Sequence, residues 1–185
     1  CLSGVPVLDD PPRGLSGHNL KLFLAALGTS GSVGLIYIRG VSPEFRRVED
    51  RLVSLERVEV GSEELKEAME DLGNREGAVL LGCPHLSAEE LEGVLRALGG
   101  RRPRRRLVLF TSRAEAGRAG AAVGRLRSLG VEVYRDTCMV VSDLRAMGVE
   151  RCVVDSMKAA YYLRAQGYEV GWATRREAIE LALKG

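Results

Sequence analysis

Short apolar runs alternate with longer amphipathic segments along most of the chain. The runs are rich in valine, leucine and isoleucine and predict buried strands over residues 32–38, 78–81, 107–110, 131–134, 152–154 and 168–170. Between them, apolar residues recur at helical spacing, and each helix is expected to bury one face. Three helix starts carry a capping box, in which serine or threonine precedes glutamate by three positions: Ser87–Glu90, Ser112–Glu115 and Thr174–Glu177.

Repetition of strand, short polar loop and helix predicts an α/β fold with a mostly parallel sheet and helices on both faces. In such a sheet the loops that follow the strands share the carboxyl edge, where ligands bind. Helix N-termini at that edge attract phosphate or carboxylate groups. Residues 1–16 are rich in proline and glycine, so we expect a lead-in or linker there and an α/β domain over residues 17–185.

Local signals add detail at three places. Leucines around Lys21 predict a short helix that ends at Gly28. Ser42-Pro43-Glu44 predicts a helix start with Ser42 as its N-cap. The strand over residues 78–81 is expected to end at Gly82, so that Cys83 and His85 lie in a polar loop before the next helix.

Composition narrows the functional classes. The chain has 185 residues and a net charge of +2, which indicates neither nucleic acid nor a membrane surface as a partner. It contains no apolar run of about 18 residues and no secretory signal, so we expect a cytoplasmic protein. Its four cysteines have no short paired spacing and do not predict a disulfide scaffold. The first residue is Cys1 rather than methionine, which suggests a piece of a longer polypeptide.

Side chains capable of chemistry collect in the loops that follow the predicted strands. They are Ser42; Cys83 and His85; Thr111, Ser112 and Arg113; Asp136, Thr137 and Cys138; and Asp155, Ser156 and Lys158. Two thiols at one edge suit a soft metal or an iron–sulfur cluster. Hydroxyls at helix N-caps, together with Arg113 and Lys158, suit an anionic substrate.

Each of these side chains also has an interpretation without a ligand. Single cysteines are commonly small buried hydrophobes, and Cys152 lies in an apolar run typical of a core strand. His85 can simply bond a backbone carbonyl, and the serines are explained as N-caps. The basic run 101–106 is read as a solvated turn, because no aromatic side chains that could stack on bases lie near it. No glycine-rich dinucleotide fingerprint or P-loop accompanies a strand.

Taken together, four motifs resemble, in this order, those of the large subunit of the aconitase X family. They are Gly82-Cys83-Pro84-His85-Leu86-Ser87, Thr111-Ser112-Arg113, Asp136-Thr137-Cys138-Met139-Val140-Val141, and the run from Asp155-Ser156-Met157-Lys158 to Leu163. Upstream, Leu20-Lys21, Gly31-Ser32-Val33 and the run 40–44 fit the same family. The resemblance runs from about residue 16 to the end and implies an aconitase-like fold. It also implies that the chain corresponds to the C-terminal half of a longer large subunit.

The resemblance further implies a hydro-lyase that works with a small subunit and with the N-terminal half of the large subunit. Members dehydrate mevalonate 5-phosphate to anhydromevalonate 5-phosphate in an archaeal mevalonate pathway of isoprenoid biosynthesis, or dehydrate cis-3-hydroxy-L-proline. We favour the phosphorylated substrate because the chain is rich in arginine and resembles a separate subunit. A non-catalytic α/β assembly module is the alternative of a different class.

By the same resemblance, Cys83 and Cys138 are ligands of an iron–sulfur centre, with a third ligand in the N-terminal half. A [4Fe–4S] cluster is preferred, and [2Fe–2S] or mononuclear iron is left open. His85 and Lys158 are the expected catalytic residues. The expected substrate-binding residues are Ser42, Thr111, Ser112, Arg113 and Ser156. The family's usual asparagine is Asp155 here, and a common histidine is Tyr161, so these two positions depart from its pattern.

Overall fold

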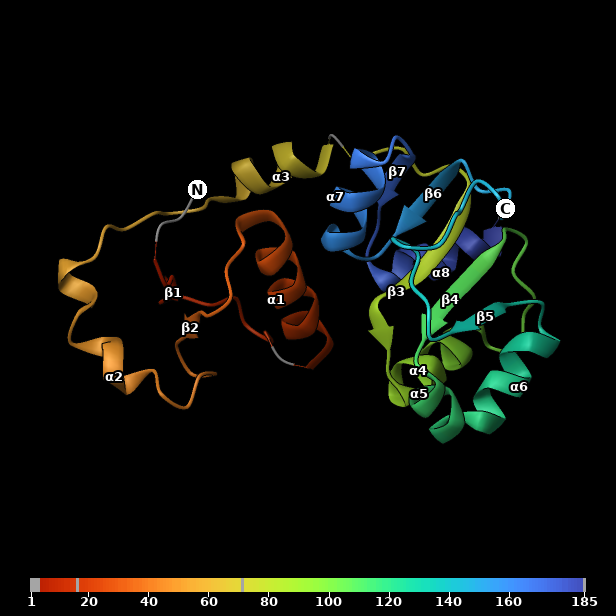
Figure 1. Cartoon of the computed structure of the whole chain (residues 1–185), viewed down its shortest axis with the longest axis horizontal. Helices are drawn as coiled ribbons and strands as arrows, with labels where there is room; N and C mark the ends of the chain where they lie inside the picture. Colours follow the sequence, from red (N-terminus) through yellow and green to blue (C-terminus); the bar gives the residue numbers. More distant parts are fainter. Residues whose placement is uncertain (1–3, 16, 71, 185) are drawn as a thin grey trace. The chain divides into compact units, whose positions relative to one another are not determined.

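The computed structural model describes residues 4–15, 17–70 and 72–184. The chain forms two compact units, one that extends to Ala68 and one that begins at Met69 (Figure 1). This division differs from the expected single domain over residues 17–185. Among the described residues, no helix is long and apolar enough to cross a membrane.

The first unit has little regular structure. Its elements are β1 (Val7–Leu8), α1 (Gly17–Gly31), β2 (Tyr37–Ile38), α2 (Arg46–Glu49), a 3-10 turn (Leu52–Ser54) and α3 (Ser62–Glu70), the last of which spans the division. Strands β1 and β2 pair in parallel and make a sheet of their own. Ile38 and Phe45 are the buried hydrophobic side chains described in this unit.

Several expectations for the first unit are wrong. Residues 4–15 are not merely a linker, because β1 pairs with β2. The predicted strand over residues 32–38 shrinks to Tyr37–Ile38, since Leu35 is 54% exposed and the run before Tyr37 has no ladder partner. Helix α1 continues to Gly31 rather than ending at Gly28. An apolar run alone therefore did not distinguish a buried strand from an extended surface segment.

The second unit is the predicted α/β fold. Its elements are β3 (Ala78–Leu86), α4 (Ala88–Leu98), β4 (Leu107–Thr111), α5 (Arg113–Arg118), α6 (Gly120–Ser128), β5 (Glu132–Arg135), β6 (Arg151–Val154), α7 (Met157–Ala165), β7 (Glu169–Trp172) and α8 (Arg175–Lys184). The strands form one parallel sheet in the order β5-β4-β3-β6-β7. The parallel sheet expected from the sequence is confirmed.

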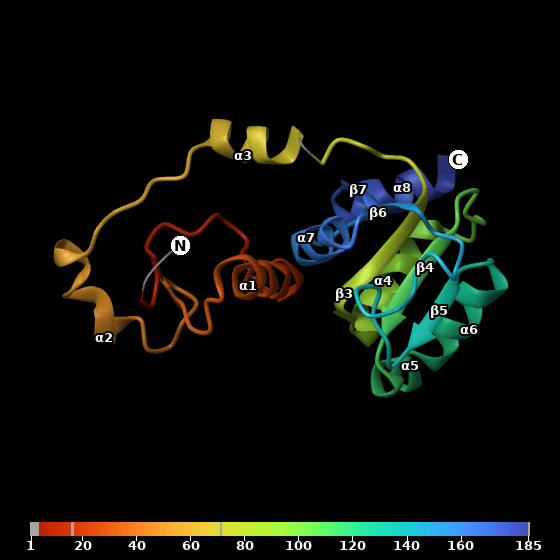
Figure 2. The same cartoon turned by 45° about the horizontal axis from the view of Figure 1, so that its top comes forward.

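Helices cover both faces of this sheet, as predicted (Figures 1 and 2). On one face, the apolar sides of α4, α6 and α8 pack with inward residues such as Leu81 and Leu109. On the other face, α7 and the segment between β5 and β6 pack with the alternate residues, such as Leu80 and Val108. Alternation along each strand thus supplies two cores, because successive side chains point to opposite faces.

Strand β3 breaks its ladder with β4 near its carboxyl end. Pairing is regular up to Leu81 and resumes where Leu86 lies opposite Thr111. Gly82 has φ +111°, and a Cβ there would lie 2.2 Å from the carbonyl oxygen of Phe110. The predicted end of the strand at Leu81 is therefore wrong: the motif Gly82–His85 is an irregularity within the strand, and only glycine fits at its start.

Gly82→Ala is expected to lower the free energy of unfolding of the second unit by about 2 kcal/mol, because the added methyl group cannot coexist with the Phe110 carbonyl. Chemical denaturation followed by the fluorescence of Trp172, the single tryptophan of the chain, measures this. Gly124→Ala is the matched control in α6, with open space around its Cβ position, and should raise stability by about 0.5–1 kcal/mol. Equal stabilities for the two variants would contradict this interpretation of Gly82.

Candidate functional site

The carboxyl edge of the large sheet brings together most of the predicted site residues. Because β3 to β6 are parallel, the segments that follow them meet at one edge. The carboxyl-terminal part of β3 carries Cys83 and His85, and the segments after β4, β5 and β6 carry Ser112, Arg113, Asp136, Thr137, Cys138, Asp155, Ser156 and Lys158. Ser42 lies in the first unit instead, where its Oγ accepts a hydrogen bond from the Ile38 amide at 2.9 Å. It closes a turn and is not the N-cap of α2, which begins at Arg46.

Cys83 is the buried thiol of this edge. Burial raises its pKa to about 11, while the positive charge of Lys158 and a hydrogen bond with the Ser156 hydroxyl act in the opposite direction. Ser156 is itself buried, and its Oγ accepts from the Ala159 amide at 3.3 Å to cap α7. The hydroxyl proton of Ser156 therefore remains available for the sulfur of Cys83.

Cys138 is the second thiol of this edge. It is partly exposed and lies in the segment after β5, close enough to Cys83 that its charge would add to the rise in the pKa of the Cys83 thiol, after the larger effect of burial. Cys152 differs from both, because it is 1% exposed in the core and burial alone raises its pKa to about 12. Cys83 and Cys138 therefore lie near one another, although they come from the ends of different strands. Cys152 is a core residue, as expected.

His85 joins two loops of the edge. Its Nε2 lies 2.7 Å from the carbonyl oxygen of Thr137, and since a carbonyl can only accept, Nε2 carries the proton. This bond ties the segment of Cys83 to the segment of Cys138. His85 thus bonds a backbone carbonyl, which is the structural role considered for it from the sequence. Its catalytic role stays a prediction.

The hydroxyl and guanidinium groups after β4 are bonded within the chain. Thr111 is buried, and its Oγ1 donates to the Leu86 carbonyl at 2.6 Å. Ser112 caps α5 by accepting from the Glu115 amide at 3.1 Å. Arg113 donates to both carboxylate oxygens of Asp136, from its amide at 2.7 Å and from Nε at 2.8 Å. Their predicted contact with substrate stays a prediction.

The pair of Arg113 and Asp136 has a clear electrostatic consequence. The Arg113 amide and then its guanidinium hold the pKa of the Asp136 carboxyl below its usual range. Asp136 has φ +58°, a left-handed conformation that aspartate tolerates better than most residues. The loop after β5 is thereby anchored to the start of α5.

The N-terminus of α4 does not offer the expected anion site. Its capping box is complete, because the Ser87 amide donates to Glu90 Oε2 at 2.8 Å and the Glu90 amide donates to Ser87 Oγ at 3.2 Å. The Ala88 amide donates to Glu115 Oε2 at 2.8 Å. Glu115, predicted to complete its own capping box with Ser112, instead spans two helices. These amide groups already have anionic or polar partners.

A buried ion-pair network at the same edge was not predicted. Arg175, in the first turn of α8, donates to Asp155 Oδ2 at 2.7 Å and to Glu90 Oε1 at 2.9 Å. Asp155 Oδ1 is buried and has no hydrogen-bond partner among the described residues. The sequence contains one local indication of this network. Arg175 is a cation in the first turn of α8, where the helix dipole disfavours positive charge unless a carboxylate lies nearby.

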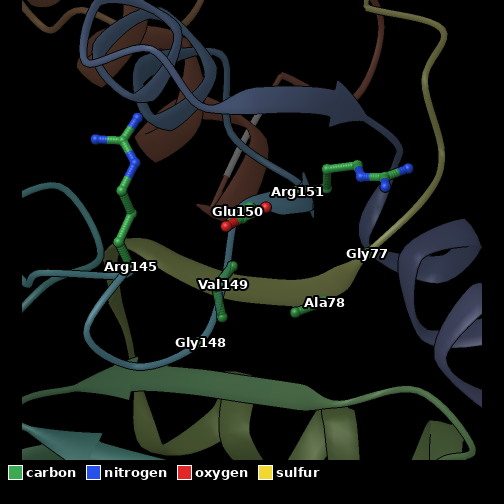
Figure 3. Close-up of a pocket in the computed structure, with 7 residues that line it drawn as sticks. All are labelled: Gly77, Ala78, Arg145, Gly148, Val149, Glu150 and Arg151. Carbon is green, nitrogen blue, oxygen red and sulfur yellow. The ribbon is translucent and has the colours of Figure 1, made fainter.

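A cavity of about 400 Å³ lies at the opposite, amino-terminal edge of the sheet (Figure 3). It is lined at the starts of β3 and β6 and contains none of the predicted site residues. Its two arginines already have partners: Arg145 donates to the Gly167 carbonyl at 3.1 Å, and Arg151 pairs with Glu76. The predicted site residues of this unit therefore lie at the carboxyl edge, and none of them lines this cavity.

The donor set of the carboxyl edge fits part of an iron site. Within residues 4–15, 17–70 and 72–184, no group of three or more His, Cys, Asp or Glu side chains is arranged to hold a metal ion. Cys83, in β3, and Cys138, after β5, nevertheless place two thiols near one another at this edge, and thiolates are the ligands of iron–sulfur clusters. Cys1 has no predicted role and lies outside the described residues.

Comparison with known proteins identifies the class. Residues 77–184 match the family model of the aconitase X third domain, and residues 2–70 match that of the aconitase X second domain. The chain belongs to the aconitase X family, as its motifs predicted. The two matched regions agree with the division of the chain between Ala68 and Met69.

Individual relatives support the same conclusion. The chain is 40% identical over 177 residues to the phosphomevalonate dehydratase large subunit of Aeropyrum pernix, an alignment that covers 91% of this chain and 42% of the relative. It is 32% identical over 200 residues to the cis-3-hydroxy-L-proline dehydratase of Pseudomonas aeruginosa, covering 100% of this chain and 34% of the relative. The crystal structure of Thermococcus kodakaraensis aconitase X (holo-form) superposes with a TM-score of 0.87 at 27% identity, over 96% of this chain and 47% of that one.

The chain therefore spans less than half the length of these relatives. A site assembled by the whole protein has room for residues from outside these 185 positions. The two thiols at the carboxyl edge, Cys83 and Cys138, would be one part of such a site.

His85→Ala is expected to loosen the loop after β5, because it removes the hydrogen bond to the Thr137 carbonyl. Loss of about 1 kcal/mol should speed hydrogen exchange of the backbone amides of residues 137–142 about fivefold. His85→Gln is the matched variant, since its amide can donate to the same carbonyl, and it should exchange near the wild-type rate. Unchanged exchange in His85→Ala would show that the bond does not hold this loop.

Proposed function

We propose that this chain supplies one part of the active site of an aconitase X hydro-lyase, which removes water from a phosphorylated or carboxylated hydroxy acid. The observation that carries the proposal is the placement of Cys83 and Cys138 near one another at the carboxyl edge of a sheet whose sequence matches the aconitase X third domain. The lysine of the α7 start lies at the same place and supplies a positive charge.

In this proposal Cys83 and Cys138 are two ligands of an iron–sulfur centre, and a further ligand comes from the N-terminal half of the large subunit. An iron with an open coordination position supplies Lewis-acid chemistry toward the departing hydroxyl group. We prefer a [4Fe–4S] cluster, with [2Fe–2S] and mononuclear iron as alternatives. Burial raises the pKa of Cys83, while the charge of Lys158 and the hydroxyl of Ser156 act in the opposite direction, toward the thiolate that metal binding requires.

The remaining residues of the edge act on the substrate or on the ligands. Lys158 and Arg113 attract a carboxylate or phosphate, and Lys158 lies at the start of α7, where the helix dipole adds to its charge. His85 keeps the segments of Cys83 and Cys138 together through its Nε2 bond to the Thr137 carbonyl. In its proposed catalytic role it gives a proton from the other ring nitrogen, Nδ1, to the departing hydroxyl group, which leaves as water. Thr111, Ser112 and Ser156 are the proposed substrate contacts at this edge. Ser42, in the first unit, stays a substrate contact predicted from the sequence.

The substrate we favour is mevalonate 5-phosphate, converted to anhydromevalonate 5-phosphate in an archaeal mevalonate pathway. Support comes from the relatives named phosphomevalonate dehydratase large subunit, at 40% identity in Aeropyrum pernix and 34% in Methanocaldococcus jannaschii. The term large subunit in these names supports a small subunit as partner. Cis-3-hydroxy-L-proline is the second candidate, because a relative at 32% identity carries that name. The cytoplasmic location expected from the sequence stays a prediction.

Cys83→Ser and Cys138→Ser should each abolish retention of iron and sulfide in the anaerobically purified complex of the full-length large subunit with its small subunit. Serine keeps the size of the side chain but does not supply a thiolate ligand. Cys152→Ser is the matched control, because Cys152 lies in the core and should leave the iron content unchanged. Full iron and sulfide in either of the first two variants would contradict the ligand assignment.

The same complex should dehydrate mevalonate 5-phosphate and show much less activity toward cis-3-hydroxy-L-proline. Product formation from each substrate, measured by mass spectrometry, decides between them. Preference for the hydroxyproline would reverse the substrate choice. Turnover of neither substrate, in a complex without iron, would favour the non-catalytic assembly module.

A further inference from the structure

Arg175 bridges two segments beside the candidate site, the first turn of α4 and the residue that follows β6. Its guanidinium donates to Asp155 at 2.7 Å and to Glu90 at 2.9 Å. The exposed fractions of these side chains are 17% for Arg175, 12% for Glu90 and 1% for Asp155. Removing one member of so buried a set leaves an uncompensated charge, so the planar guanidinium firmly restrains both carboxylates.

Glu90 and Asp155 are each connected to a segment next to Cys83. The other oxygen of Glu90 accepts from the Ser87 amide at 2.8 Å, directly after the end of β3, the strand that carries Cys83. Asp155 directly precedes Ser156, which caps α7 and bonds the Cys83 thiol. The bridge therefore connects the exit of β3 to the start of α7, and Cys83 lies between these two points.

This arrangement is costly for the stability of the second unit. The buried carboxylate of Asp155 and the partly buried carboxylate of Glu90 share one guanidinium, and Asp155 Oδ1 has no hydrogen-bond partner among the residues described. A buried carboxylate oxygen without a donor costs free energy. Arg175 also places a positive charge where the dipole of α8 is positive. A requirement on the geometry of the site explains why such a costly network is present.

We propose that Arg175 is a positioning residue for the iron site. Through Glu90 and Asp155 it fixes the exit of β3 relative to the start of α7, and so holds the Cys83 thiol beside Ser156 and Lys158. Arg175 does not touch the metal or the substrate in this scheme. The inference rests on the proposed function, because it gives Cys83 its place as an iron ligand.

The test compares Arg175→Gln with Arg106→Gln in the full-length large subunit bound to its small subunit. Arg106 also makes a two-pronged ion pair, with Glu132 at 2.5 and 2.8 Å, and it donates to the Met147 carbonyl. This pair lies at the amino-terminal edge of the same sheet, because Arg106 directly precedes β4. It therefore controls for the loss of a bridging arginine away from the site.

The first readout needs no iron. In the iron-free complex, alkylation of Cys83 followed by mass spectrometry should be about tenfold faster in Arg175→Gln than in wild type or Arg106→Gln, because the lost bridge allows local opening. Cys152, on β6 of the same core, is the internal reference and should not change. Arg175→Lys should give an intermediate rate, since an ammonium group cannot reach both carboxylates in the same way.

The second readout uses the anaerobically loaded complex. Arg175→Gln should show an altered electron paramagnetic resonance spectrum and about tenfold weaker iron retention, while Arg106→Gln keeps the wild-type spectrum. If Arg175→Gln does not fold, Arg175→Lys serves for both readouts. Equal Cys83 alkylation rates and identical spectra in the Arg175 variants and wild type would overturn the inference while leaving the proposed function intact. A wild-type complex without iron or turnover would instead overturn the proposed function.

Discussion

The break in β3 between Leu81 and Leu86 is the constraint on which the candidate site depends. Regular pairing would keep this stretch in register with β4 along its whole length. Instead, Gly82 approaches the Phe110 carbonyl, and the ladder is interrupted until Leu86 pairs with Thr111. Cys83 thereby meets groups that follow β6, and His85 meets the loop after β5. One irregular strand brings three loops together.

Two opposing effects act on the pKa of the Cys83 thiol at this edge. Burial raises the pKa of Cys83, and the charge of Lys158 with the hydroxyl of Ser156 partly counteracts that effect. A cation bound at this thiol would favour its thiolate form further, because metal ligation requires a deprotonated sulfur. Cys152 shows the contrast, because only burial acts on its pKa.

Local sequence rules predicted the parts of this fold that depend on near neighbours. The capping box at Ser87 and the order of strands and helices after residue 77 followed from residues a few positions apart. The pairing of Arg175 with Asp155 and Glu90 did not, because these residues are 20 and 85 positions apart and nothing local specifies the contact. The break in β3 was also missed, since a glycine after an apolar run reads as the end of a strand.

Anomalous diffraction at the iron absorption edge, from crystals of the anaerobically prepared complete enzyme, tests the central claim most directly. The account predicts an iron peak bonded to the sulfur atoms of both Cys83 and Cys138, with at least one more ligand from outside this chain's described residues. Iron bound elsewhere, with both thiols unligated, would contradict it.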